Sequence, residues 1–171
     1  AEIQKRIGPF RAYGVLAEIT YTSDAVTLRF DATRLKREGI VGHVYETARP
    51  DTVPLHRWLN PRRGDHYYTT MAGDSGRPGP AFVYEGIVAH VPAGPGAGVV
   101  PLGRWRGPRE WVFAADPQAE SLKRLGYRPE APAFFVFGDP APAGSVPFYR
   151  FVDPRTHLHF YTTHPQAGFA K

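Results

Sequence analysis

The chain has no cysteine among its 171 residues and only one methionine. Without cysteine it can form neither a disulfide framework nor a thiolate metal site. It also lacks any run of about 18 apolar residues, the length that a membrane-spanning helix requires, so we expect no membrane span. The length suits one core and is short for two domains, and we predict a single domain over residues 1–171.

Glycine, proline and aromatic residues are abundant instead. There are 18 Gly and 18 Pro, and 13% of the residues are aromatic, a composition that favours many short strands joined by tight turns. We therefore predict a mainly β fold with short helices. The net charge of +5 favours anionic partners, but it is spread along the chain without the like-charge run of a nucleic-acid tail, so nucleic acid is not an expected partner.

An internal repeat organises the sequence. The segment VPLHRWLNPRRGDHYYTT (53–70) returns as VPFYRFVDPRTHLHFYTT (146–163), and a diverged copy, VPLGRWRGPREWVFAA (100–115), lies between them. Their prolines, Pro54, Pro101 and Pro147, are 47 and then 46 residues apart. Such a period is typical of solenoids, propellers and pseudo-symmetric barrels. The predicted repeats are approximately 9–53 (degenerate), 54–100, 101–146 and 147–171 (truncated).

Each repeat is predicted to contain a hairpin, a short helix and a third strand. Pro-Arg turns form the hairpin tips, and the helix is clearest in DPQAESLKRLG (116–126), with DATRLKREG (31–39) as a second instance. The third strands begin at Glu38, Glu85 and Glu130. Because these glutamates recur at symmetric positions, we expect them to have a structural role.

The ends of the chain are expected to close the ring of repeats. The opening AEIQKRIG resembles AESLKRLG (119–126), so the N-terminus would supply the helix that the last repeat lacks. Closure leaves no sheet edge exposed. We predict a pseudo-threefold, closed, β-trefoil-like architecture; if residues 9–31 form a true fourth copy, the alternative is a small four-bladed β-propeller.

The residues PLHRWLNPRRGDHYYTT followed by YEG and an apolar strand resemble a repeat family of secreted bacterial and fungal proteins with the signature YRFYNPxTGDHFYTT…YEGVAYYV. The resemblance covers about 32–165, and the middle hairpin departs from it by losing the Gly-Asp-His segment. The family has no agreed activity. The resemblance implies a secreted protein and a sugar- or surface-binding role.

We predict a non-catalytic module that binds carbohydrate or a cell-surface glycan and needs no cofactor. In each unit an aromatic ring would stack on a sugar while neighbouring polar groups bind its hydroxyls. The predicted ligand-binding residues are Arg57, Trp58, Asp65, His66, Tyr68, Arg104, Trp105, Arg150, Phe151, His159 and Tyr161. The same pattern also fits a structural interpretation, in which the aromatics fill the core and the arginines form salt bridges or lie at the surface.

Other functions remain open at this stage. His157, His159 and His164 could hold a metal, which makes a metal-dependent hydrolase the alternative from another class, although no carboxylate stands at a helpful spacing. A structural or protein-interaction domain is a third possibility. Finally, Arg62, Arg109 and Arg155 at the predicted hairpin tips could form a basic rim that binds acidic polymers.

Overall fold

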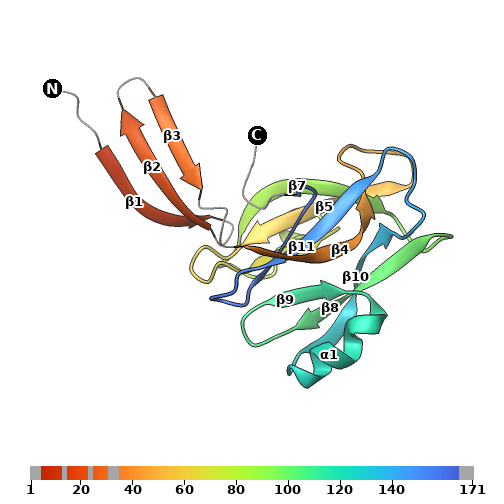
Figure 1. Ribbon diagram of the computed structural model, residues 1–171. Coiled ribbons are helices and arrows are strands. Elements are labelled where there is room, and N and C mark those ends of the chain that lie inside the picture. Colours follow the sequence, from red (N-terminus) through yellow and green to blue (C-terminus); the bar gives the residue numbers. More distant parts are fainter. Residues whose placement is uncertain (1–4, 13–14, 23–24, 31–34, 166–171) are drawn as a thin grey trace.

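The structure is a computed structural model that describes residues 5–12, 15–22, 25–30 and 35–165 (Figure 1). Its strands are β1 (Lys5–Ala12), β2 (Val15–Thr22), β3 (Ala25–Phe30), β4 (Lys36–Val44), β5 (Thr52–Leu59), β6 (His66–Thr69), β7 (Val83–Pro92), β8 (Val99–Arg106), β9 (Trp111–Ala114), β10 (Arg128–Phe137), β11 (Val146–Val152) and β12 (His159–Thr162). The helical segments are η2 (Gly73–Gly76), η3 (Asp116–Gln118) and α1 (Ala119–Arg124). The prediction of a mainly β fold with short helices is confirmed.

The strands form antiparallel sheets. Strands β1, β2 and β3 form one sheet, a second has the order β6-β5-β7, and a six-stranded sheet has the order β12-β11-β4-β10-β8-β9. Within the described ranges, none of these sheets closes into a barrel. The β-trefoil and the propeller are therefore not confirmed and stay predictions.

Three units nevertheless share one pattern of strand pairing. In each unit the first strand of a hairpin pairs with its hairpin partner on one side and with a long third strand on the other. We call β5, β6 and β7 unit 1; β8, β9 and β10 unit 2; and β11, β12 and β4 unit 3. The third strand of unit 3 thus comes from a segment that precedes unit 1 in the sequence.

This arrangement corrects two predictions. The expected helix over 31–39 is wrong for Lys36 to Gly39, which belong to strand β4; residues 31–34 lie outside the described residues. The helix expected at the N-terminus is also wrong where the structure describes it, because Lys5–Ala12 is strand β1. The element that completes the last repeat is a strand, β4, which pairs with β11 along its length.

The three hairpins meet in an aromatic cluster formed by Tyr68, Phe113 and Tyr161. Their ring centroids are 5.3–5.7 Å apart with edge-to-face geometry. The hydroxyl of Tyr68 donates to the carbonyl of Tyr161 and accepts from its N–H, and the hydroxyl of Tyr161 bonds the backbone of Phe113 in the same way. Each tyrosine therefore satisfies the free edge of the next short strand, which explains why edges β9 and β12 can lie buried.

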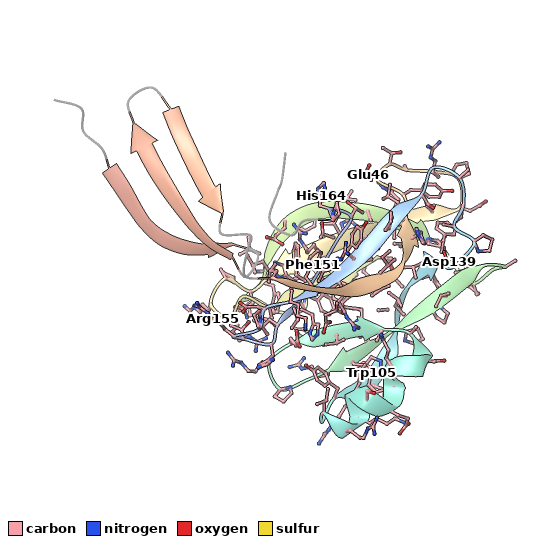
Figure 2. All side chains as sticks on the ribbon, viewed as in Figure 1. Glu46, Trp105, Asp139, Phe151, Arg155 and His164 are labelled. Atoms are coloured by element: carbon pink, nitrogen blue, oxygen red, sulfur yellow. The ribbon has the colours of Figure 1, made fainter. Side chains whose placement is uncertain are left out.

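The helical segment predicted over 116–126 is confirmed, as η3 and α1. Leu122 is its buried residue and packs in a cluster with Trp105, Val112 and Ala114 of unit 2. Figure 1 shows α1 lying against β8 and β9, and Figure 2 shows Trp105 at this contact. The helix covers the outer face of unit 2 and forms one wall of the site described next.

Candidate functional site

An arginine–glutamate pair recurs in all three units. The Nε atoms of Arg57, Arg104 and Arg150 lie 2.7, 2.6 and 2.7 Å from the Oε2 atoms of Glu85, Glu130 and Glu38, respectively. Each arginine lies on the first strand of a hairpin, and each glutamate on the third strand of the same unit. The structural role expected for the three glutamates is therefore ion pairing with these arginines.

Bulges in the third strands direct the carboxylates toward the arginines. In unit 3, Arg150 is opposite Gly39 whereas the next residue, Phe151, is opposite Arg37, so Glu38 is the extra residue on its strand. The same shift leaves Glu85 as the extra residue of unit 1. A bulged residue is re-aimed relative to the regular pleat, and here it faces across to the neighbouring strand.

Two of the arginines are covered by an aromatic ring of an adjacent unit. The guanidinium carbon of Arg57 lies 5.0 Å from the ring centroid of Phe160, and that of Arg104 lies 5.5 Å from the ring of Tyr67. Nη1 of Arg104 also donates a hydrogen bond to the Tyr67 hydroxyl. These are cation–π contacts that fill the space beside each guanidinium.

Within the described residues no aromatic ring covers the third arginine, Arg150, because the equivalent residue is Val112. The hairpin registers establish the equivalence: Tyr67 is opposite Trp58, Val112 is opposite Trp105, and Phe160 is opposite Phe151. A cavity of about 300 Å³ lies at this position. We call it the Val112 pocket; its lining residues are Glu38, Val112, Gln118, Ser121, Leu122, Leu125, Tyr127, Arg150 and His159.

A network of charged groups lines the Val112 pocket and extends from His159 to Glu110. The ring of His159 lies between two carboxylates, with Nδ1 2.8 Å from Glu110 and Nε2 3.3 Å from Glu38. Glu110 also accepts from the backbone N–H of His159 and from the hydroxyl of Tyr127, both at 2.7 Å. Although burial opposes protonation, the two carboxylates raise the pKa of His159 to about 9.

The side chain of Arg150 is held at the pocket by two acceptors. Its Nε donates to Glu38, and its Nη1 donates to Oε1 of Gln118 at 3.2 Å. The hydrogen bond from His159, together with Arg150, lowers the pKa of Glu38, against the effect of burial. With Glu38 and Glu110 ionised and His159 and Arg150 protonated, the four groups carry no net charge.

The aromatic residues predicted to stack on sugar rings are core residues instead. Trp58, Trp105 and Phe151 are only 7, 6 and 3% exposed, so they offer no ring face to a ligand in this structure. Tyr68 and Tyr161 lie in the central aromatic cluster. This is the structural interpretation of the pattern, in which the rings fill the core and the arginines form ion pairs.

The polar residues of the prediction are divided among the units. Asp65 is fully buried and binds Arg63 at the first hairpin tip, while His66 lies 3.5 Å from Glu85, near Arg57. Of the predicted site residues, the structure brings Arg150 and His159 together in the Val112 pocket.

Sequence reasoning missed most of this site, including Val112, Gln118 and Tyr127 of the lining and Glu110, which binds His159. One signal was available. The middle repeat carries Glu110 and Val112 where the first repeat has Asp65 and Tyr67, and the loss of an aromatic at one copy marks the place where the symmetry is broken. The contact of Glu110 with the next hairpin carried no sequence signal.

A larger cavity of about 630 Å³ lies among the loops that connect the units. Its lining includes Tyr45, Phe137 and several prolines, and its charged residues, Arg49 and Asp51, are exposed. Figure 2 places Glu46 and Asp139, from these loops, at the end of the molecule opposite Arg155. The charged residues of the larger cavity are exposed and therefore do not orient a ligand as buried polar groups do. We regard the smaller Val112 pocket as the better candidate site.

The histidines do not assemble into a metal site in the described part of the chain. Among the described residues, no group of three or more His, Asp or Glu side chains is arranged so that it could hold an ion. Both ring nitrogens of His159 face carboxylates, so a protonated ring has no lone pair for a metal. His157 and His164 are exposed.

A family model described as "Domain of unknown function (DUF5648)" matches residues 14–116 and again 77–167. The chain belongs to this family. The two DUF5648 matches overlap within 77–116, which agrees with a sequence made of repeats. They support an uncharacterised repeat family but do not confirm the specific signature to which the sequence was compared.

No curated protein and no solved structure matches the chain. Membership in DUF5648 names no activity, so the function must be argued from the site itself. In the described part of the chain, every helix is too short or too polar to cross a membrane.

Proposed function

We propose that this chain is a non-catalytic binding module, that the Val112 pocket is its ligand site, and that the ligand is a carbohydrate. The observation that carries the proposal is the lining of the pocket. It combines a hydrogen-bond donor and an acceptor that hold each other in place, namely Arg150 and Glu38, with an apolar wall from Leu122 and Leu125. Sugars need both, since their hydroxyls donate and accept while their ring carbons are apolar.

The state of the charged groups favours binding over catalysis. The ring of His159 contacts a carboxylate at each nitrogen, and the pKa near 9 keeps it protonated at neutral pH. A protonated histidine cannot act as a general base. Both N–H groups of the protonated His159 ring face carboxylates, those of Glu38 and Glu110. We also propose that the protein is secreted, because a cell-surface glycan is reached from outside the cell.

The trefoil-like arrangement also belongs to this proposal. It is supported by the common strand pairing of the three units and by the aromatic cluster of Tyr68, Phe113 and Tyr161 at which they meet. In such an arrangement one of several equivalent positions can diverge to bind a ligand while the others keep a structural role.

The test is a glycan array at low and moderate salt, followed by calorimetry with the best glycan. Arg150→Met should weaken binding at least about tenfold, because a hydrogen bond to a charged group contributes about 1.5–3 kcal/mol. Arg104→Met is the matched control: it removes the equivalent ion pair at a position closed by Tyr67. Equal losses in both variants, or no binding across the array, would contradict the proposal.

A second candidate function has its own observation. Arg62, Arg109 and Arg155 are all exposed at hairpin tips. The three hairpin tips approach one another. Glu110, next to the second tip, accepts a hydrogen bond from the backbone N–H of His159, which follows the third tip. Gly64, at the first tip, lies so close to Leu158 that a Cβ atom on it would be 3.7 Å from the leucine side chain. This basic rim would bind acidic polymers, and that binding would fade with salt. Binding that survives moderate salt would exclude the rim as its source.

A further inference from the structure

We infer that the ligand of the Val112 pocket inserts one neutral, hydroxyl-bearing ring beside Arg150, in the place that an aromatic side chain fills in the two equivalent positions. The inference rests on the proposed function and deepens it, since it names the part of the glycan that is bound: a single sugar ring without a carboxylate. Val112 is then the residue that determines whether this position binds a ligand.

The molecule itself shows what fits against these arginines. At two of three equivalent positions the guanidinium is covered by a six-membered ring, from Phe160 over Arg57 and from Tyr67 over Arg104. At the third position the strand geometry and the ion pair are the same, but the side chain is a valine and a cavity remains. A ring supplied by a ligand would restore the contact that the other two positions make internally.

Tyr67 further indicates that the ring should carry a hydroxyl. Its phenol accepts a hydrogen bond from Nη1 of Arg104. In the Val112 pocket the corresponding Nη1 of Arg150 donates instead to the side chain of Gln118, a residue exposed at the surface. A hydroxyl on the ligand ring can take the place of the Gln118 oxygen, because exposed glutamine side chains are readily displaced.

The size of the pocket suits one sugar ring, and its charge favours a neutral one. A volume of about 300 Å³ equals that of about ten water molecules at about 30 Å³ each, which is enough room for one sugar ring. Glu38 lines the same cavity as Arg150. A carboxylate on the ligand would meet this acidic group and would compete for a guanidinium that is already paired.

The first experiment fills the pocket from within the protein. Val112→Tyr should place a phenol beside Arg150 as Tyr67 does beside Arg104, which should raise Tm by about 2–4 °C and abolish glycan binding. Val112→Leu is the matched control, because it stays apolar and too small to fill the cavity, and should retain binding. Full binding by a folded Val112→Tyr protein would overturn the inference while leaving a glycan-binding function intact at another site.

The second experiment needs no glycan and no stable variant at position 112. In wild-type protein, p-cresol should bind saturably and shift the methyl NMR signals of Val112 and Leu122, and Gln118→Ala should bind it at least as well. Tyr67→Val should create a second p-cresol site beside Arg104, seen as a Tm that p-cresol raises more than in wild type. Absence of saturable shifts at Val112 would overturn the inference.

The two experiments separate the inference from the proposed function. Saturable p-cresol binding at Val112 with no response to any glycan would support a ring-binding position and contradict the carbohydrate proposal. Glycan binding that is unaffected by p-cresol and by Val112→Tyr would support a carbohydrate-binding function and contradict the ring-binding position at Val112.

Discussion

His66 and His159 occupy the same position in units 1 and 3, yet their surroundings shift their pKa values in opposite directions. Each precedes an aromatic residue on the second hairpin strand, and each lies near the bulge glutamate of its own unit, at 3.5 Å from Glu85 and 3.3 Å from Glu38. Burial and the neighbouring Arg57 hold the pKa of His66 well below its usual value. The pKa of His159 is raised to about 9 instead.

The difference comes from the neighbouring unit. His159 bonds Glu110, which directly precedes the second strand of the unit 2 hairpin. His66 belongs to unit 1, whose neighbour is unit 3. In unit 3 the residue equivalent to Glu110 is Leu158, which is buried and apolar. In a repeat fold, therefore, the properties of a residue depend on the copy next to its own as much as on its own sequence. The Val112 pocket arises in the same way.

The largest expected effect comes from removing that neighbour. Glu110→Leu gives unit 2 the residue type that Leu158 supplies in unit 3, so His159 should come to resemble His66. Because the change breaks a buried ion pair and removes the partner of Tyr127, we expect a loss of about 3 kcal/mol in the free energy of unfolding. Urea unfolding measures the loss, and an NMR titration should place the pKa of His159 below 6.5, its ordinary value.

Glu120→Leu serves as the control, since Glu120 is an exposed carboxylate on α1 whose contact is a surface pair with Lys123. It should change the stability by less than about 0.5 kcal/mol. If the pKa of His159 stays near 9 in Glu110→Leu, Glu38 alone accounts for the protonation and the comparison between units fails.

The pH dependence of stability gives the next effect. The pKa of His159 is about 9 in the folded protein against an ordinary 6.5, so its stabilising contribution is complete below about pH 6.5 and is lost as the pH rises through about 9. The size should be about 3 kcal/mol. For His66 the sign is reversed, because its folded pKa is lowered: its contribution is present above pH 6.5 and is lost as the pH falls.

Urea midpoints between pH 5 and pH 10 test both halves of this comparison. The urea midpoint of His159→Gln should stay constant between about pH 6.5 and 9, where that of the wild type falls. The midpoint of His66→Gln should fall less than that of the wild type as the pH is lowered from 7 to 5. Matching slopes in wild type and His159→Gln would show that His159 is not held protonated by its neighbours.

Much of this fold could be predicted from the sequence, because it depends on local chemistry. The Pro-Arg turns, the paired strands around Trp58 and Phe151, and the helix after Asp116 each follow from residues close in the chain. The third strands were also predictable, since Glu38, Glu85 and Glu130 keep the period. Of these third strands, β4 was the one whose first residues were predicted to be helical. The segment DATRLKREG contains helix-favouring residues, but its described end pairs with β11 as a strand.

The candidate site was less predictable, because it is built from contacts between units. Arg150 and His159 were selected from the repeat, but Gln118 reaches Arg150 from a helix that belongs to another unit. Trp58 and Trp105 were expected to face a ligand, since a strand pattern does not say which face is core. What the sequence did contain was the valine at position 112, whose importance becomes visible only when Arg57 and Arg104 are seen to be covered by rings.

The central aromatic cluster allows the smallest and most local test of the comparison between units. Tyr68 and Tyr161 each use a hydroxyl to bond the backbone N–H and C=O of the next hairpin, but Phe113 has no hydroxyl to offer to Tyr68. Phe113→Tyr should complete the cycle and stabilise the protein by about 1 kcal/mol, seen as a rise in Tm. Tyr161→Phe is the converse change and should cost at least as much, because it leaves the N–H and C=O of Phe113 buried without their partner. If Phe113→Tyr instead destabilises the protein, the third hairpin junction is packed too closely to admit a hydroxyl, and the three junctions differ in shape as well as in chemistry.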